Sequence, residues 1–380
     1  MHRRQLLAQG AGLGLAGPWM KLSHAAEPGV STDEILLGQS CVLSGPLGVS
    51  LQGFNAGAKL AFDDANAKGG VAGRRIRVET LDDELKPDRA VANYRLLLEE
   101  KKVFAFFGGV GSGTTAAVAP LLKASGAVLV GNYAVSDAAR RQAQGHAFFL
   151  RAPYGREAQK IVQHLTTLGI HRIAVAHLDN PGGVEVVSML NEAMATFAKG
   201  KPLAAAAPVK NDGSNIDEAI DALAKASPQA VVMFLSGPPV SRLMSGMAAR
   251  GLAPSYYGMS TVAGERVAAD LGDKLRGLAI CQVVPLPWAA VEPTTRAYQQ
   301  LAETAQVPVS YYSFEGYLNA MVMLEALRRC GKEPTRAGLQ KVMQSLRMRL
   351  AGVDIDFTDS HTGSRFVEMV QVRPNGKFVR

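Results

Sequence analysis

The chain has 380 residues, 47% hydrophobic and 19% charged, which is typical of a globular protein long enough for two domains. Its formal net charge is +8, and loss of residues 1–25 would remove three positive charges (Arg3, Arg4 and Lys21), leaving +5. The remaining basic residues are scattered among acidic ones, with no interleaved aromatic stripe. We therefore expect no nucleic-acid binding.

Residues 1–26 have the pattern of a secretory signal peptide. The adjacent Arg3 and Arg4 precede a short apolar stretch, and "SHA" predicts cleavage near Ala25 or Ala26. The paired arginines indicate the twin-arginine export route, and hence a periplasmic protein. The apolar stretch is short for a membrane anchor, and no run of about 18 apolar residues follows, so we expect no transmembrane helix.

The first half of the chain alternates short apolar strands with amphipathic helices. Phe54, Ala58 and Ala65 recur at helical spacing, and the following Gly69-Gly70 pair predicts the end of that helix. Strands are expected at 34–43, 74–83, 103–109 and 127–133, and helices at 52–70, 86–102 and 114–126. Repeated strand–helix–strand units predict a parallel sheet with helices on both faces.

The alternation then restarts after the segment 148–157, which predicts a second α/β unit. Strands are expected at 171–178, 203–208, 230–236 and 254–260, and helices at 157–169, 183–200, 215–228, 239–251, 310–331 and 336–346. Near the C-terminus, the turn signal "PNG" between two apolar runs predicts a β-hairpin.

The stretch "FFGGVGSGTTAAVAP" (106–120) predicts a glycine-rich loop that leads from a strand into a helix. A phosphate-binding loop would need a lysine where Thr114 stands, and the glycine spacing does not match the dinucleotide-binding motif. What remains is a neutral, hydroxyl-rich cradle at a helix N-terminus, which suits a single carboxylate. The alternative is a tight turn whose glycines serve sterics alone.

No motif for a metal, a cofactor or catalysis is present in the sequence. The three cysteines (Cys41, Cys281 and Cys330) have no metal-binding spacing, and the sequence leaves open whether any of them form a disulfide. Serines occur in the glycine-rich segments, but none lies in a G-x-S-x-G motif with a general base. We therefore expect a protein without catalytic residues, bound metal or cofactor.

Several motifs in order resemble the periplasmic leucine/isoleucine/valine-binding protein family. They are "SGP" (Ser44, Gly45, Pro46), "NAKGGVAGR", "DDELKPDRAVAN", "FFLRAPYGREAQKIVQHL" and the final "GSRFVEMVQV", so the resemblance covers nearly the whole mature chain. It implies the type I periplasmic binding protein fold, with two Rossmann-like α/β lobes, a hinge of three crossings and a ligand cleft between the lobes. We expect lobe 1 to comprise 30–151 plus 282–352, and lobe 2 to comprise 152–281 plus 353–380.

The resemblance also implies a function. Members are substrate-binding proteins of ATP-binding-cassette (ABC) importers, in which the ligand closes the lobes and a membrane permease recognises the closed form. We expect a monomer that binds a small carboxylate-bearing metabolite: a branched-chain or other amino acid, or an aromatic or aliphatic acid. A periplasmic sensor that presents the same ligand class to a receptor is the alternative.

In the first lobe, the resemblance assigns ligand contacts to two loops. Ser112 falls on the family's carboxylate-binding serine, and Val110 falls on a backbone contact beside it. Tyr133, Val135 and Ser136 fall on the second ligand-binding loop, where the branched-chain binders have a threonine in place of Val135. Tyr133 could stack on an apolar or aromatic ligand, or serve only in packing.

The remaining positions depart from the family's amino-acid binders. Ser50, Gly182 and Ser236 fall where those proteins have tyrosines that cover the ligand, and Ser260 falls where they have a glutamate that pairs with the ligand's ammonium group. Burying an ammonium without a carboxylate costs several kcal/mol. A carboxylate ligand without the ammonium therefore fits at least as well, unless another acid, Glu185 or Glu265, takes the role.

Overall fold

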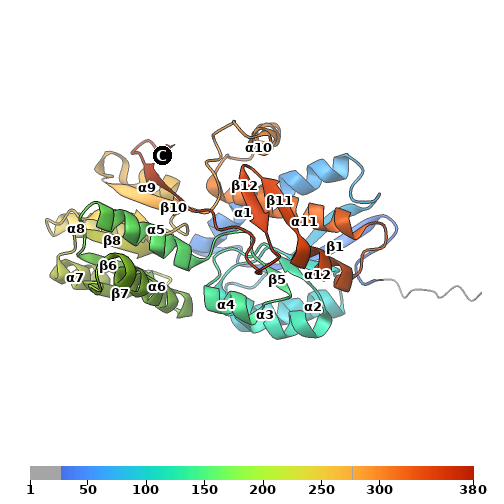
Figure 1. Cartoon of the computed structure of the whole chain (residues 1–380), viewed down its shortest axis with the longest axis horizontal. Helices are drawn as coiled ribbons and strands as arrows, with labels where there is room; N and C mark the ends of the chain where they lie inside the picture. The colour runs from blue at the N-terminus through green and yellow to red at the C-terminus, as the bar shows by residue number, and fades with distance from the viewer. Residues whose placement is uncertain (1–26, 276) are drawn as a thin grey trace, which may run out of the picture.

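The computed structural model describes residues 27–275 and 277–380, so the predicted signal peptide lies outside the described residues. The strands form two separate larger sheets, each covered by helices, and a small two-stranded sheet (Figure 1). The predicted α/β architecture with two lobes is confirmed. Among the described residues, no helix is long and apolar enough to cross a membrane.

The sheet of the first lobe has five parallel strands in the order β2-β1-β3-β4-β5. They are β1 (Glu34–Cys41), β2 (Arg75–Asp82), β3 (Ala105–Phe107), β4 (Leu129–Val130) and β5 (Ala147–Phe148). Seven of the eight residues of β1 are buried. This is the expected burial of a parallel strand whose two faces are both covered by helices.

The helices of the first lobe come from both ends of the chain. They are α1 (Gly45–Ala67), α2 (Pro87–Glu99), α3 (Ser112–Ser125), α4 (Asp137–Gln142), α10 (Pro293–Thr304), α11 (Tyr311–Cys330) and α12 (Arg336–Ser345). Two glycines let α1 and α11 pack in direct backbone contact. A Cβ atom at Gly57 would lie 1.7 Å from the carbonyl oxygen of Ser313, and one at Gly316 would lie 1.8 Å from that of Phe54.

The sheet of the second lobe has seven strands in the order β14-β13-β10-β9-β8-β6-β7. The strands are β6 (Ile173–Leu178), β7 (Ala205–Val209), β8 (Ala230–Phe234), β9 (Ser255–Gly258), β10 (Leu278–Gln282), β13 (Glu368–Val372) and β14 (Phe378–Val379). The first five are parallel, and β13 and β14 form the antiparallel hairpin that the "PNG" turn predicts. The helices are α5 (Tyr154–Thr167), α6 (Pro181–Phe197), α7 (Ile216–Ala226), α8 (Pro238–Ala249), α9 (Gly264–Leu271) and the short 3-10 helix η1 (Gly272–Lys274).

The chain passes between the lobes after β5, after β10 and before β13. The small sheet, β11 (Arg347–Leu350) with β12 (Val353–Asp356), spans the predicted lobe boundary at 352. The residues after β12 stay with the first lobe, because Phe149 N–H donates to the carbonyl of His361 and Gly363 N–H donates to that of Phe149. A boundary near residue 364 fits these contacts better than one at 352, and the division of the chain into lobes stays a prediction.

All three cysteines are free. Cys41 and Cys281 are buried, and Cys330 is partly exposed. Burial raises the pKa of the Cys41 thiol to about 12. These cysteines therefore pack as small apolar side chains.

Candidate functional site

A cavity of about 200 Å³ lies between the two lobes. Its walls come from the loops that follow β3, β4, β6 and β8, at the carboxyl ends of parallel strands, where open α/β sheets place their ligands. The lining residues are Leu47, Leu85, Pro87, Gly111, Ser112, Gly113, Thr114, Ala134, Tyr154, Leu178, Asn180, Pro181, Gly182, Asn211, Phe234, Ser236 and Thr261.

Several helices begin at this cavity. Among them, α3 begins at Ser112, α6 begins at Pro181, and α8 begins two residues after Ser236. No side chain caps the first turn of α3 or of α8, whose N-cap residues are glycines. Helix N-termini present backbone N–H donors and a partial positive charge, so their convergence favours an anion.

The glycine-rich loop has the geometry that its sequence predicts. Gly108, Gly109 and Gly111 all have positive φ angles (68°, 131° and 94°), which favour glycine. The hydroxyl groups of Thr114 and Thr115 donate to backbone carbonyls of the same loop, so they hold its shape. The glycines therefore serve a tight strand-to-helix turn, and this turn also exposes the first N–H groups of α3.

Ser112 has a hydroxyl proton that no described group accepts. Its Oγ accepts a hydrogen bond of 2.9 Å from the N–H of Ser136, and the side chain lies at the cavity wall. Gly182 of the opposite lobe is so close that a Cβ atom there would lie 3.1 Å from Ser112 Oγ. The two lobes thus meet at the predicted carboxylate-binding serine.

Of the nine residues predicted to contact a ligand, three line this cavity: Ser112, Gly182 and Ser236. The other six lie outside its lining and are Ser50, Val110, Tyr133, Val135, Ser136 and Ser260, all of them buried. Their direct contact with a ligand stays a prediction.

The second predicted loop reaches the cavity through Ala134, which the sequence reasoning did not single out. Val135 packs in the core of the first lobe instead. Tyr133 N–H donates to the carbonyl of Gly109, so its backbone joins the two loops. The Tyr133 ring stacks under the Arg151 guanidinium, whose carbon lies 4.4 Å from the ring centroid. These contacts favour the packing role for Tyr133 in this conformation.

Ser260 belongs to a buried ionic network at the hinge. Its backbone N–H and its hydroxyl donate to the two carboxylate oxygens of Glu157, at 2.7 and 2.8 Å, and its Oγ accepts from Arg151 Nη2 at 2.8 Å. Arg151 Nε lies 3.2 Å from a carboxylate oxygen of Glu315 in α11. Burial raises the pKa of Glu157, and the Arg151 charge partly opposes that shift. The network ties both lobes to the first crossing, and Ser260 takes part in it through its backbone N–H and its hydroxyl group.

No aspartate, glutamate, lysine, arginine or histidine side chain lines the cavity among the described residues. The two acids considered as ammonium partners lie elsewhere. Glu185 accepts from the Ala138 N–H at 2.8 Å, a contact between the lobes, and lies 3.8 Å from Arg141. Burial raises the pKa of Glu265, which is half-buried and has one carboxylate oxygen without a partner.

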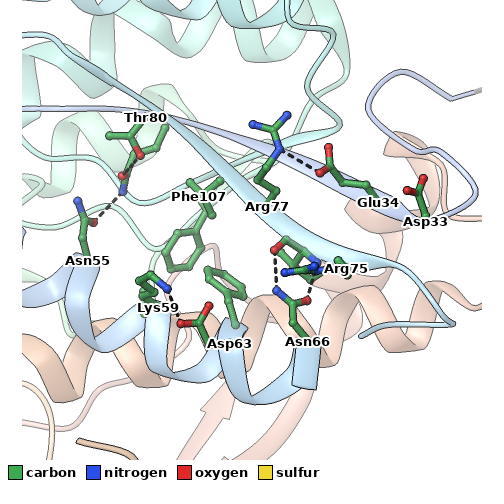
Figure 2. Close-up of a pocket in the computed structure, with 15 residues that line it drawn as sticks. Asp33, Glu34, Asn55, Lys59, Asp63, Asn66, Arg75, Arg77, Thr80 and Phe107 are labelled. Carbon is green, nitrogen blue, oxygen red and sulfur yellow. Dashed lines mark hydrogen bonds and ion pairs between the residues drawn. The ribbon is translucent and has the colours of Figure 1, made fainter. Parts of the chain in front are cut away.

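A larger cavity, of about 630 Å³, opens on the first lobe alone, between α1 and β2 (Figure 2). Its polar groups satisfy one another: Gln39 donates to Asn55 at 3.0 Å and accepts from Thr80 at 2.9 Å. Several of its charges are also paired, as in the Arg77–Glu34 bridge at 3.0 Å. Its lining residues all belong to the first lobe, so it does not match the expected cleft between the lobes.

The residues that sequence reasoning missed include Tyr154 and Phe234 in the cavity and Glu157 and Glu315 in the hinge network. A signal was available for Glu157, because it lies on the apolar face of α5, where an acid requires a buried partner. Tyr154 follows Pro153 directly at the start of a helix, which could have placed it at the cleft.

The comparisons with known proteins agree with this geometry. A profile of the family described as periplasmic binding protein matches residues 34–377. No curated protein matches the chain by sequence.

Among solved structures, a substrate-binding periplasmic protein from Ralstonia solanacearum is 28% identical, with a TM-score of 0.83 over 91% of this chain and 99% of that one. A possible leucine/isoleucine/valine-binding protein from Rhodopirellula baltica is 24% identical, with a TM-score of 0.83 over 92% and 98%. An ABC transporter solute-binding protein from R. palustris in complex with 4-hydroxybenzoate is 17% identical, with a TM-score of 0.79 over 91% and 95%. The two lobes, the cleft between them and a profile match over most of the chain show that this protein belongs to the periplasmic binding protein family.

Proposed function

We propose that this protein is the periplasmic substrate-binding component of an ABC importer, and that it holds a small carboxylic acid between its lobes. One observation carries the proposal: the starts of α3, α6 and α8 lie at a cavity whose lining has no charged side chain among the described residues. A site of this kind attracts a single negative charge through backbone N–H groups rather than through a counter-ion. The proposal assigns no catalytic role to any side chain of this site.

The energetics favour one carboxylate. Each helix N-terminus acts as roughly +0.5 of an elementary charge, and the effect is largest where water is excluded. A hydrogen bond to a charged group contributes about 1.5–3 kcal/mol. The uncapped first turn of α3, with the free hydroxyl proton of Ser112, supplies such donors at one wall of the cavity.

The same lining disfavours an α-ammonium group. An amino acid would bring its positive charge into a cavity to which the described residues contribute no carboxylate, close to helix N-termini. We therefore propose an acid without an α-ammonium group. The R. palustris structure contains 4-hydroxybenzoate, which is such an acid, but at 17% identity it shares only the fold. The alternative, a branched-chain or other amino acid, requires Glu185 or Glu265 to turn toward the cavity.

Cleft closure is the mechanism that the proposal requires. In this conformation, Glu185 of α6 bonds to the N–H of Ala138 in α4, and Gly182 faces Ser112. Both contacts join residues on opposite lobes, so they break when the cleft opens. A ligand that bridges α3 and α6 would stabilise the closed form, which is the form that a permease would recognise.

Calorimetry with matched acid pairs tests the ligand class. The mature protein is titrated with 4-methyl-2-oxopentanoate and leucine, and with phenylpyruvate and phenylalanine. We expect each oxo acid to bind at least as tightly as its amino acid. A thermal-shift screen over aliphatic and aromatic acids comes first, because a ligand at 100 times its dissociation constant adds about 2.7 kcal/mol of stability. Tight binding of leucine without binding of the oxo acid would contradict the proposal.

The proposed periplasmic location has its own test. N-terminal sequencing of the protein from its native host should give a mature start near Ala26 or Glu27. Replacing Arg3 and Arg4 together by lysine should leave precursor in the cytoplasm, since the twin-arginine route reads that pair. An intact Met1 on the native protein would contradict export by cleavage.

A further inference from the structure

Tyr154 lies at the cleft and has an unpaired hydroxyl group. The residue lines the cavity and has 0% exposure, and its hydroxyl forms no hydrogen bond with any described group. Leaving a buried hydroxyl unpaired costs about 1–3 kcal/mol. A group of this kind at a binding site indicates a partner that arrives with the ligand.

The ring of Tyr154 is held firmly in place. The residue is the first of α5, and its backbone N–H donates to Asp137 Oδ1 at 3.2 Å. Its ring packs edge-to-face on Phe234, with ring centroids 5.0 Å apart, and Phe234 also lines the cavity. The hydroxyl is therefore pre-organised, and little conformational entropy remains to be lost when it binds.

The surroundings of the hydroxyl make it a donor. Burial raises the pKa of Tyr154 well above its usual value, so the group keeps its proton at every physiological pH. The positive charge of Arg151 nearby opposes that shift and polarises the O–H bond, whereas Glu157 acts in the opposite sense. An oxygen atom on the ligand could accept a hydrogen bond from such a donor.

We propose that Tyr154 donates a hydrogen bond to a second oxygen atom of the ligand, away from the carboxylate held at α3. This inference rests on the proposed function and narrows its ligand class to hydroxy or oxo carboxylic acids. The second oxygen is neutral, because no cationic side chain among the described residues lines the cavity to balance another carboxylate. An acid lacking this oxygen would leave the Tyr154 hydroxyl buried and unpaired, which is the strongest basis for discrimination between similar ligands.

The experiment compares acids that differ by one oxygen. Calorimetry on the mature protein uses benzoate with 4-hydroxybenzoate, and pentanoate with 4-oxopentanoate. For the pair that fits the cavity, we expect the oxygen-bearing acid to bind at least 10-fold more tightly. In Tyr154→Phe this advantage should fall below threefold, while the affinity for the plain acid stays within twofold. Tyr256→Phe is the matched control, since Tyr256 is also buried with an unpaired hydroxyl but lies outside this cavity, and it should leave both affinities unchanged.

A second measurement follows the unliganded protein. Because the Tyr154 hydroxyl has no protein partner, Tyr154→Phe should keep or raise the melting temperature without ligand. A lowered melting temperature would show that the hydroxyl bonds within the protein and would overturn the inference. Equal binding of plain and oxygen-bearing acids would also overturn it while leaving the proposed function intact. Binding of none of the carboxylates in the thermal-shift screen would refute both.

Discussion

Ser112 offers the most direct test of the proposed carboxylate site. Its Oγ already accepts a hydrogen bond from Ser136 N–H at 2.9 Å, so only its proton is available to a ligand. Ser112→Ala removes one charge-assisted hydrogen bond, worth about 1.5–3 kcal/mol. Since about 1.4 kcal/mol is a factor of ten, the dissociation constant should rise roughly 10-fold to 150-fold.

The same substitution has a smaller effect on the unliganded protein. The Ser136 N–H loses its acceptor at the start of α4, which should cost about 1 kcal/mol of unfolding free energy. The binding effect is thus larger than the stability effect and can be separated from it. Calorimetry with the best acid from the screen gives the first quantity, and urea unfolding gives the second.

Ser241→Ala is the matched control for Ser112→Ala. Ser241 is a buried serine in α8 that donates to Asp270 at 2.8 Å, outside the cavity. Its removal should change stability by a similar amount and leave the affinity unchanged. If Ser112→Ala binds the acid within twofold of the unchanged protein, the carboxylate does not lie at α3 and the proposed site is wrong.

Three further substitutions test the cleft, the hinge and the core. Gly182→Ala would bring a methyl group to 3.1 Å from the Ser112 hydroxyl, so ligand affinity measured by calorimetry should fall several-fold. The melting temperature should stay within about 2 °C, which corresponds to less than about 1 kcal/mol of unfolding free energy. Unchanged affinity would show that the lobes do not meet at this residue. Glu157→Gln should lower the unfolding free energy by about 1–3 kcal/mol, because the side-chain NH2 group cannot accept one of the two hydrogen bonds that Ser260 donates to the carboxylate, and a loss below 0.5 kcal/mol in urea would contradict the network. Burial raises the pKa of Glu157 in the folded state, so its protonation favours folding: stability should fall as pH rises above the usual value near 4.5, and this contribution should be absent from the pH profile of Glu157→Gln. Gly57→Ala would place a Cβ 1.7 Å from a backbone carbonyl of α11, and should lower the unfolding free energy by about 3 kcal/mol or more; a normal melting curve would show that α1 and α11 pack differently.

Much of the fold could be predicted because each strand and helix carries its own local signal. The buried β1 lies within the predicted strand at 34–43, and α2 lies within the predicted helix at 86–102. The first helix begins at Gly45 rather than near residue 52, because Gly45, Pro46 and Gly48 at its start are residues typical of a turn.

The site was only partly predictable. The glycine-rich loop and Ser112 could be located because a strand, a tight turn and a helix follow one another within a few residues. The sequence analysis singled out Ser260 as a ligand contact, yet its partners in the structure are Glu157 and Arg151, about a hundred residues away in the chain. No local pattern indicates such pairs, since they form only when the crossing segment packs against the second lobe.

The sequence by itself determined the α/β class, the two-lobed architecture through its family resemblance, and a neutral glycine-rich turn at Ser112. The α/β class and the turn follow from hydrophobic periodicity and backbone sterics, which act over a few residues. Only the tertiary structure decided that the starts of α3, α6 and α8 share one cavity, and that Tyr154, whose hydroxyl is unpaired, lines it. Burial and hydrogen-bond satisfaction depend on which distant segments meet, and that is settled when the two sheets pack and the lobes close on each other.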